Sequence, residues 1–144
     1  MPYTELYVHL VWATRERAPL LDDARAPLVE RAVRGLCREH GAVPHAVGIM
    51  PDHLHVAASF PARLAIAELV RLVKGGSSHL LNQELVRPGE PFAWQAEYGA
   101  LTFGKRSLPE VVAYVRDQRR HHAAGTCLPA LERLDRRDAP RPVP

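Results

Sequence analysis

An alternation of polar and apolar residues over residues 50–60 constrains this chain more than any other feature. A period of two predicts a β-strand, because successive side chains of a strand point to opposite faces. The apolar face, which suits a core, carries Leu54, Val56, Ala58 and Phe60. The other face carries His53, His55, Ala57 and Ser59. Two imidazoles therefore project side by side from one rigid element.

Two adjacent imidazoles on a strand can hold a divalent metal ion. Two ordinary histidines on a partly exposed strand are the alternative, and an isolated His-x-His motif favours it. The remainder of the chain shifts the balance toward the metal.

Strands and helices follow one another in a definite order along the chain. Further strands are predicted over residues 3–13, 42–50 and 92–103, the last irregular with Gly99 as a bulge. Helices are predicted from a cap at Asp22 or Asp23 to residue 40, and over residues 64–82 with a kink at Gly75-Gly76. A last helix begins at Ser107, which has capping-box spacing to Glu110, and ends before Gly125.

This order is β-α-β-β-α-β followed by an extra helix, which predicts an α+β, ferredoxin-like (RRM-like) fold. Such a sheet packs its two helices on one face and leaves the other face open. The last helix is the natural candidate to cover the open face, where the two histidines point. We expect one domain over residues 1–134 and a disordered tail over residues 135–144, which mixes Arg, Asp and Pro.

The last helix presents polar groups along one face, since Tyr114, Gln118 and His122 are spaced at four-residue intervals. A packing stripe whose tyrosine is an amphipathic core residue is the alternative. Placed over the histidine face, Tyr114 would supply a nucleophilic oxygen and Gln118 a neutral oxygen ligand. With His53 and His55, this arrangement makes a two-nitrogen, one-oxygen metal site with open positions.

Composition sets broad limits on function. The net charge of +3 and a pI near 9.2 permit nucleic-acid binding without specifying it. The two cysteines, Cys37 and Cys127, indicate neither a metal pattern nor a disulfide framework. No apolar run reaches spanning length, and no charged-then-apolar leader opens the chain. We expect a soluble, cytoplasmic protein without membrane contact.

The chain also resembles a known family, the single-tyrosine HUH transposases of the insertion-sequence two-hundred type. The resemblance covers nearly the whole chain and depends on six segments in a fixed order. These are residues 7–15, 51–56, 72–75 with Ser77-Ser78, 92–95 with 98–100, 114–118, and the pair His121-His122.

The resemblance implies a function and roles for individual residues. His53 and His55 match the histidines of the HUH motif, with Leu54 as the hydrophobic middle residue. Tyr114 matches the nucleophile and Gln118 the third metal ligand. Proteins that this chain resembles are homodimers that cut and rejoin single-stranded DNA through a 5′-phosphotyrosine. They recognise hairpins near the element ends and need Mg²⁺ or Mn²⁺, but no nucleotide cofactor.

Other functions remain as alternatives. A histidine-triad hydrolase would need a third alternating histidine where Ala57 stands. The main alternative is a domesticated module that binds a DNA or RNA hairpin without cutting it. RNA-binding sheets of this shape usually carry exposed stacking aromatics, and only 6% of the residues here are aromatic.

Several further residues have weaker predicted roles. Candidate phosphate contacts, for each of which a solvated surface charge is the alternative, are Lys74, Arg15, Arg17, Lys105, Arg106, Arg116, Arg119 and Arg120. His121 falls off the helix stripe and is interpreted as a cation at the helix C-terminus. His9 can reach the open face but is expected to have a structural role.

Overall fold

The computed structural model describes residues 2–85 and 87–135. Four strands form one sheet in the order β2-β3-β1-β4, and every neighbouring pair is antiparallel. The strands are β1 (Tyr7–Ala13), β2 (Val43–Met50), β3 (His53–Ser59) and β4 (Gly99–Phe103). The α+β class agrees with the sequence prediction, but three helices follow β4 where the sequence analysis predicted one.

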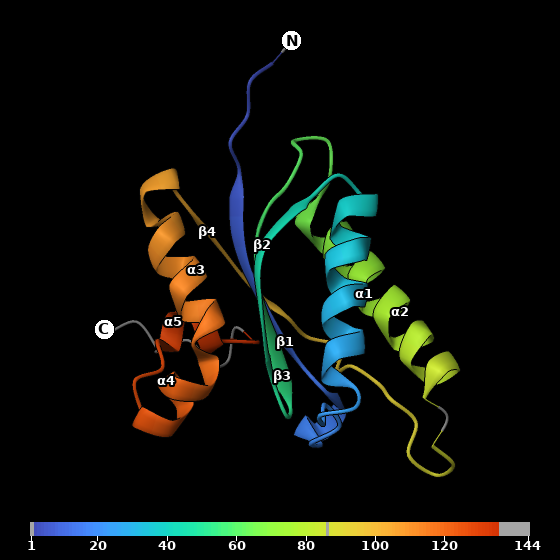
Figure 1. The fold of residues 1–144 in the computed structure, drawn as a ribbon. Helices are drawn as coiled ribbons and strands as arrows, with labels where there is room; N and C mark the ends of the chain where they lie inside the picture. The colour runs from blue at the N-terminus through green and yellow to red at the C-terminus, as the bar shows by residue number, and fades with distance from the viewer. Residues whose placement is uncertain (1, 86, 136–144) are drawn as a thin grey trace, which may run out of the picture.

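Helices cover both faces of the sheet (Figure 1). One face carries the long helices α1 (Ala26–Glu39) and α2 (Ile66–Glu84). The other face carries α3 (Leu108–Arg116), α4 (Gln118–Ala124) and α5 (Pro129–Glu132). Short 3-10 turns stand before α1 and α3, at η1 (Arg15–Arg17) and η2 (Lys105–Ser107). The predicted tail lies outside the described residues from position 136 onward.

The main core lies between the sheet and the two long helices. Alternate side chains of the central strands enter it, namely Val8, Leu10, Trp12, Leu54, Val56 and Ala58. The intervening side chains of β1 and β3 point to the opposite face, and α3 to α5 bury most of them there. The face that carries the histidines is therefore an interior surface rather than an open one.

The predicted strand over residues 92–103 is too long, because β4 begins only at Gly99. Before it, Trp94 makes a single bridge to Thr14 and packs in the main core with Phe92. The side chain of Asn82 holds the backbone of Phe92 at both its N–H and its carbonyl, at 2.8 and 2.9 Å. Backbone bonds from Arg15 to Ala93 and from Gln95 to Ala13 join this segment to the end of β1, but within the described residues no strand continues from it to Gly99.

Gly99 is not a bulge, since its pairing with Val11 continues the regular register. A Cβ at Gly99 would lie 1.8 Å from the carbonyl oxygen of Arg133. Glycine is needed here because the segment that follows α5 lies directly on the strand.

The predicted single helix over residues 107–124 is two helices that meet at Asp117, whose φ of −98° and ψ of 28° interrupt the helix. The side-chain amide of Gln118 donates to the carbonyl of Tyr114 at 2.9 Å, a bond of the kind that competes with the backbone ladder. Ser107 is the N-cap of α3, as predicted, but the capping box does not form, because Ser107 makes no side-chain capping bond. Gly125 ends α4 as predicted, with a φ of +68°.

Helix α2 runs without interruption through Gly75 and Gly76, so the predicted kink is not present. A Cβ at Gly76 would lie 2.7 Å from Cδ1 of Leu36 on α1. Gly76 therefore permits close packing of the two long helices, whereas Gly75 faces open space.

Candidate functional site

Three buried histidines lie together on the face covered by α3 to α5. His53 and His55 come from β3 and His9 comes from β1, and all three are at most 3% exposed. His9 pairs with Ala57 across the two strands, which sets its ring beside His55. Nε2 of His9 lies 2.9 Å from Nδ1 of His55. Strand pairing thus positions the imidazoles on a rigid sheet.

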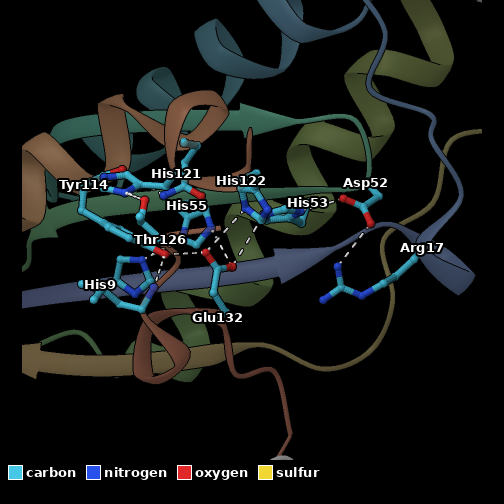
Figure 2. A network of polar contacts seen from close by, with 12 residues as sticks. His9, Arg17, Asp52, His53, His55, Tyr114, His121, His122, Thr126 and Glu132 are labelled. Carbon is cyan, nitrogen blue, oxygen red and sulfur yellow. Dashed lines mark hydrogen bonds and ion pairs between the residues drawn. The ribbon is translucent and has the colours of Figure 1, made fainter. Parts of the chain in front are cut away.

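Each histidine of the His-x-His motif is held through its Nδ1 atom (Figure 2). Nδ1 of His53 lies 2.7 Å from a carboxylate oxygen of Asp52, and Arg17 donates to the other oxygen of that carboxylate at 3.2 Å. Because a carboxylate only accepts, Nδ1 of His53 carries the proton and Nε2 keeps its lone pair. His9 holds Nδ1 of His55.

The Nε2 atoms of His53 and His55 are buried and lack a hydrogen-bond partner within the described part of the chain. Buried polar nitrogens without a partner are costly. Histidines that bind metals typically have one ring nitrogen held by a neighbouring group and the other on the ion. The pair therefore fits a divalent metal.

Burial controls the protonation of these groups. Burial lowers the pKa of His53 despite the opposing effect of Asp52. Burial, reinforced by the neighbouring His55, lowers the pKa of His9 to about 3. Burial alone would raise the pKa of Asp52, but the contacts with His53 and Arg17 lower it overall. His53 and His9 are therefore neutral near pH 7, as metal ligation and its support require.

Tyr114, on α3, lies over this face with its ring edge toward His55 at a centroid distance of 5.9 Å. Its hydroxyl donates to Oε1 of Glu132 at 2.6 Å and accepts from the backbone N–H of Leu128 at 3.0 Å. The ring of His121 packs on the ring of Tyr114, with a distance of 4.7 Å between the two centroids. Burial and the hydrogen bond to the Glu132 carboxylate raise the pKa of Tyr114, so its hydroxyl is neutral in this arrangement.

Gln118 is the first residue of α4 and is 2% exposed. Its side chain lies over Gly48 of β2, where a Cβ would be 3.1 Å from Cγ of Gln118. Gly48 pairs with His55, so Gln118 lies beside the histidine pair. Its Oε1 is buried and has no hydrogen-bond partner among the described residues.

Glu132, on α5, is a residue that the sequence analysis missed. Its Oε2 lies 3.2 Å from Nε2 of His55 and 3.7 Å from Nε2 of His53. Its Oε1 lies 3.6 Å from Nε2 of His122 on α4. Burial would raise the pKa of Glu132, but its contacts with His55, Tyr114 and His53 lower it to about 2, so it is a carboxylate.

The ligand atoms of His53, His55, His122 and Glu132 all lie within 4.8 Å of one another. His122 could be found from the sequence because it continues the stripe of Tyr114 and Gln118. Glu132 gave no comparable signal, since it follows a loop and belongs to a helix of four residues.

Most of the predicted phosphate contacts lie outside the histidine site. Lys74 lies on α2, on the opposite side of the sheet from the histidines, and donates to the carbonyls of Gln95 and Glu97. Arg17 joins the site through Asp52. The remaining basic candidates are exposed, and their role in DNA binding stays a prediction.

No helix within the described ranges combines the length and apolarity needed to cross a membrane.

Comparisons with known proteins converge on one family. The sequence model of the family described as "Transposase IS200 like" matches residues 2–118. A relative, the ISDra2 transposase TnpA of Deinococcus radiodurans, is 24% identical over 118 residues, which cover 79% of this chain and 84% of the relative.

Two solved structures have a similar fold. One is a crystal structure from Deinococcus radiodurans R1 described as a transposase, with a TM-score of 0.66 and 22% identity over 87% of this chain and 93% of that chain. The other is a REP-associated tyrosine transposase bound to a REP hairpin, with a TM-score of 0.62 and 15% identity over 88% of this chain and 73% of that chain.

Proposed function

Because this chain belongs to the IS200-like transposase family, we propose that it cuts and rejoins single-stranded DNA at the ends of an insertion sequence. The observation that carries this proposal is the Tyr114 hydroxyl, which lies in one buried site with two histidines whose Nε2 atoms have no hydrogen-bond partner among the described residues. A nucleophile beside a candidate metal site is what phosphodiester cleavage requires.

In this proposal His53, His55 and Gln118 hold a divalent ion, Mg²⁺ or Mn²⁺. The buried Nε2 atoms and the buried Oε1 of Gln118 support this ligand set, because none of them has a hydrogen-bond partner within residues 2–85 and 87–135. The ion supplies electrostatic stabilisation of the charge that develops on the scissile phosphate. Asp52 and His9 orient the imidazoles of His53 and His55 through contacts at their Nδ1 atoms.

The proposed reaction exchanges one phosphoester for another. The oxygen of Tyr114 attacks the phosphorus, a Tyr–O–P bond forms and the bond from phosphorus to the 3′ oxygen breaks. The proton of the tyrosine ends on the departing oxygen, which leaves as a free 3′-hydroxyl. The phosphodiester energy is kept in the 5′-phosphotyrosine, so a second 3′-hydroxyl can reseal the strand without a nucleotide cofactor.

The substrate and the assembly are also part of the proposal. We infer that the DNA carries a hairpin near the element end, and the similarity to a fold that binds a REP hairpin supports this. We infer a homodimer in which the sheets of two subunits join. The strand order β2-β3-β1-β4 with antiparallel pairing supports the ferredoxin-like assignment of the single domain.

A covalent adduct assay tests the function. Single-stranded oligonucleotides that tile both flanks of the gene are mixed with the protein and Mg²⁺ or Mn²⁺, and denaturing gels detect protein–DNA adducts. We expect an adduct that depends on metal and on single strands and that is absent with Tyr114→Phe, while that variant still binds DNA. An adduct with Tyr114→Phe would refute the nucleophile, and tight hairpin binding without any adduct would favour the hairpin-binding module.

A further inference from the structure

The carboxylate of Glu132 and the imidazole of His122 have no role in the proposed ligand set, yet both lie beside its histidines. The four ligand atoms of His53, His55, His122 and Glu132 come from three separate elements, β3, α4 and α5. Figure 2 shows the carboxylate between the histidines and the tyrosine. Together these groups offer three imidazole nitrogens and one carboxylate oxygen.

Two distances within this set are close to the edge of a coordination polyhedron, and all four ligand atoms lie within 4.8 Å of one another. Ligand bonds of about 2.1 Å place neighbouring donors of a tetrahedral site roughly 3.4 Å apart. Oε2 of Glu132 lies 3.2 Å from Nε2 of His55 and 3.7 Å from Nε2 of His53. Neither imidazole nitrogen makes a hydrogen bond to that oxygen in the described part of the chain, so these contacts are compatible with the edges of a metal site.

The position of Glu132 is set by packing around α5. Leu131 and Leu134, on either side of it in the chain, are each 7% exposed. Leu134 packs with Val11 and Ala13 of β1. Gly99 lets the carbonyl of Arg133 approach the sheet, as described above. The carboxylate is therefore brought to the histidines by a docked segment rather than by a loose surface chain.

We propose that His122 and Glu132 are further ligands of the metal site, and that the resulting imidazole-rich set binds a transition-metal ion more tightly than Mg²⁺. This inference rests on the proposed function for its first two ligands, His53 and His55. Imidazole nitrogens suit ions such as Co²⁺, Ni²⁺ and Zn²⁺, whereas Mg²⁺ prefers oxygen ligands and water.

Glu132 then links the metal to the nucleophile. One oxygen of its carboxylate faces the two strand histidines, while the other accepts the hydrogen bond from the Tyr114 hydroxyl at 2.6 Å. Glu132 is thus a positioning residue for the tyrosine as well as a ligand. Removal of the charge of Glu132 is expected to weaken metal binding and to weaken the hydrogen bond that holds the Tyr114 hydroxyl.

Direct metal binding tests this inference without reference to DNA cleavage. Metal-stripped full-length protein is titrated with Co²⁺, followed by its visible absorption and by calorimetry, and separately with Mg²⁺. We expect tighter binding of Co²⁺ than of Mg²⁺. We expect Glu132→Gln and His122→Ala each to weaken Co²⁺ binding at least about tenfold and to change the absorption band.

Two matched variants control for charge and fold. Glu110→Gln removes an exposed carboxylate from α3, and His121→Ala removes the imidazole next to His122. Both are expected to bind Co²⁺ within about twofold of the native protein. Thermal unfolding of each variant establishes that it is folded before its affinity is interpreted.

The outcomes separate this inference from the proposed function. If His53→Ala abolishes Co²⁺ binding while Glu132→Gln and His122→Ala leave it unchanged, the inference is refuted and the histidine site stands. If His53→Ala leaves Co²⁺ binding unchanged, the histidine site itself is wrong, and the inference fails with it. Tighter binding of Mg²⁺ than of Co²⁺ would overturn the selectivity.

Discussion

Substitution of Gly48 by alanine should disable the site through the backbone alone. Gly48 lies in β2 beneath the junction of α3 and α4, and an added Cβ would be 1.9 Å from the carbonyl oxygen of Val115. Contacts of a real Cβ are essentially never shorter than 3.0 Å. The helix junction must therefore move away from the sheet by at least about 1.1 Å, the difference between these two distances.

That movement acts directly on the functional groups. Tyr114 precedes Val115, and the Gln118 side chain also lies over Gly48. A misplacement of about 1 Å at a reacting group can cost about 100-fold in rate. Overpacking against a neighbouring segment costs about 1–3 kcal/mol of stability. We therefore expect Gly48→Ala to form the DNA adduct about 100-fold more slowly and to unfold at a lower temperature.

The assay measures the rate of adduct formation on denaturing gels together with thermal unfolding by circular dichroism. Gly104→Ala is the matched control, because a Cβ there meets nothing within 4 Å, and it should behave like the native protein. An adduct rate for Gly48→Ala within about threefold of native, at an unchanged unfolding temperature, would refute the close approach of α3 to the sheet.

Three further predictions concern stability and thiol chemistry. Burial raises the pKa of the Cys37 thiol to about 11, so roughly one molecule in a thousand carries the Cys37 thiolate at pH 8. Iodoacetamide should therefore label only the partly exposed Cys127. Two labels on the native protein, detected by mass spectrometry, would contradict this prediction. Gly75→Ala should raise the free energy of unfolding by up to about 1 kcal/mol through helix propensity. Gly76→Ala should not raise it, because the added methyl would lie 2.7 Å from the side chain of Leu36 on α1. Equal increases in the free energy of unfolding of the two variants, measured by denaturant titration, would argue against that contact. Arg25→Met should cost about 2 kcal/mol or more in the same titrations, since the buried guanidinium donates to two loop carbonyls, and an unchanged midpoint would show that these bonds contribute little.

Much of the site could be predicted from short-range patterns. The alternation around His53 and His55 correctly separated the histidine face from the core face, because strand geometry alone determines which side chains share a face. The spacing of Tyr114, Gln118 and His122 placed them together for the same kind of reason. This grouping survives the break at Asp117, since Gln118 still reaches the carbonyl of Tyr114.

The same local reasoning failed where distant segments compete for the backbone. Gly99 resembled a bulge and Gly76 a kink, but each makes room for another part of the chain, Arg133 and Leu36 respectively. Phe92 resembled a strand residue but is held instead by Asn82. A glycine has the same sequence signature in all of these roles, so only the neighbour decides between them.

Periodicities of a few residues predicted the α+β class and the two imidazoles on one strand, and the resemblance of short motifs indicated the family. The surroundings of the imidazoles depend instead on tertiary packing. His9 meets His55 across 46 positions of sequence through strand pairing, and Glu132 reaches both His53 and His55 because α5 docks against the sheet. Contacts of this kind depend on packing between elements, which no local pattern encodes.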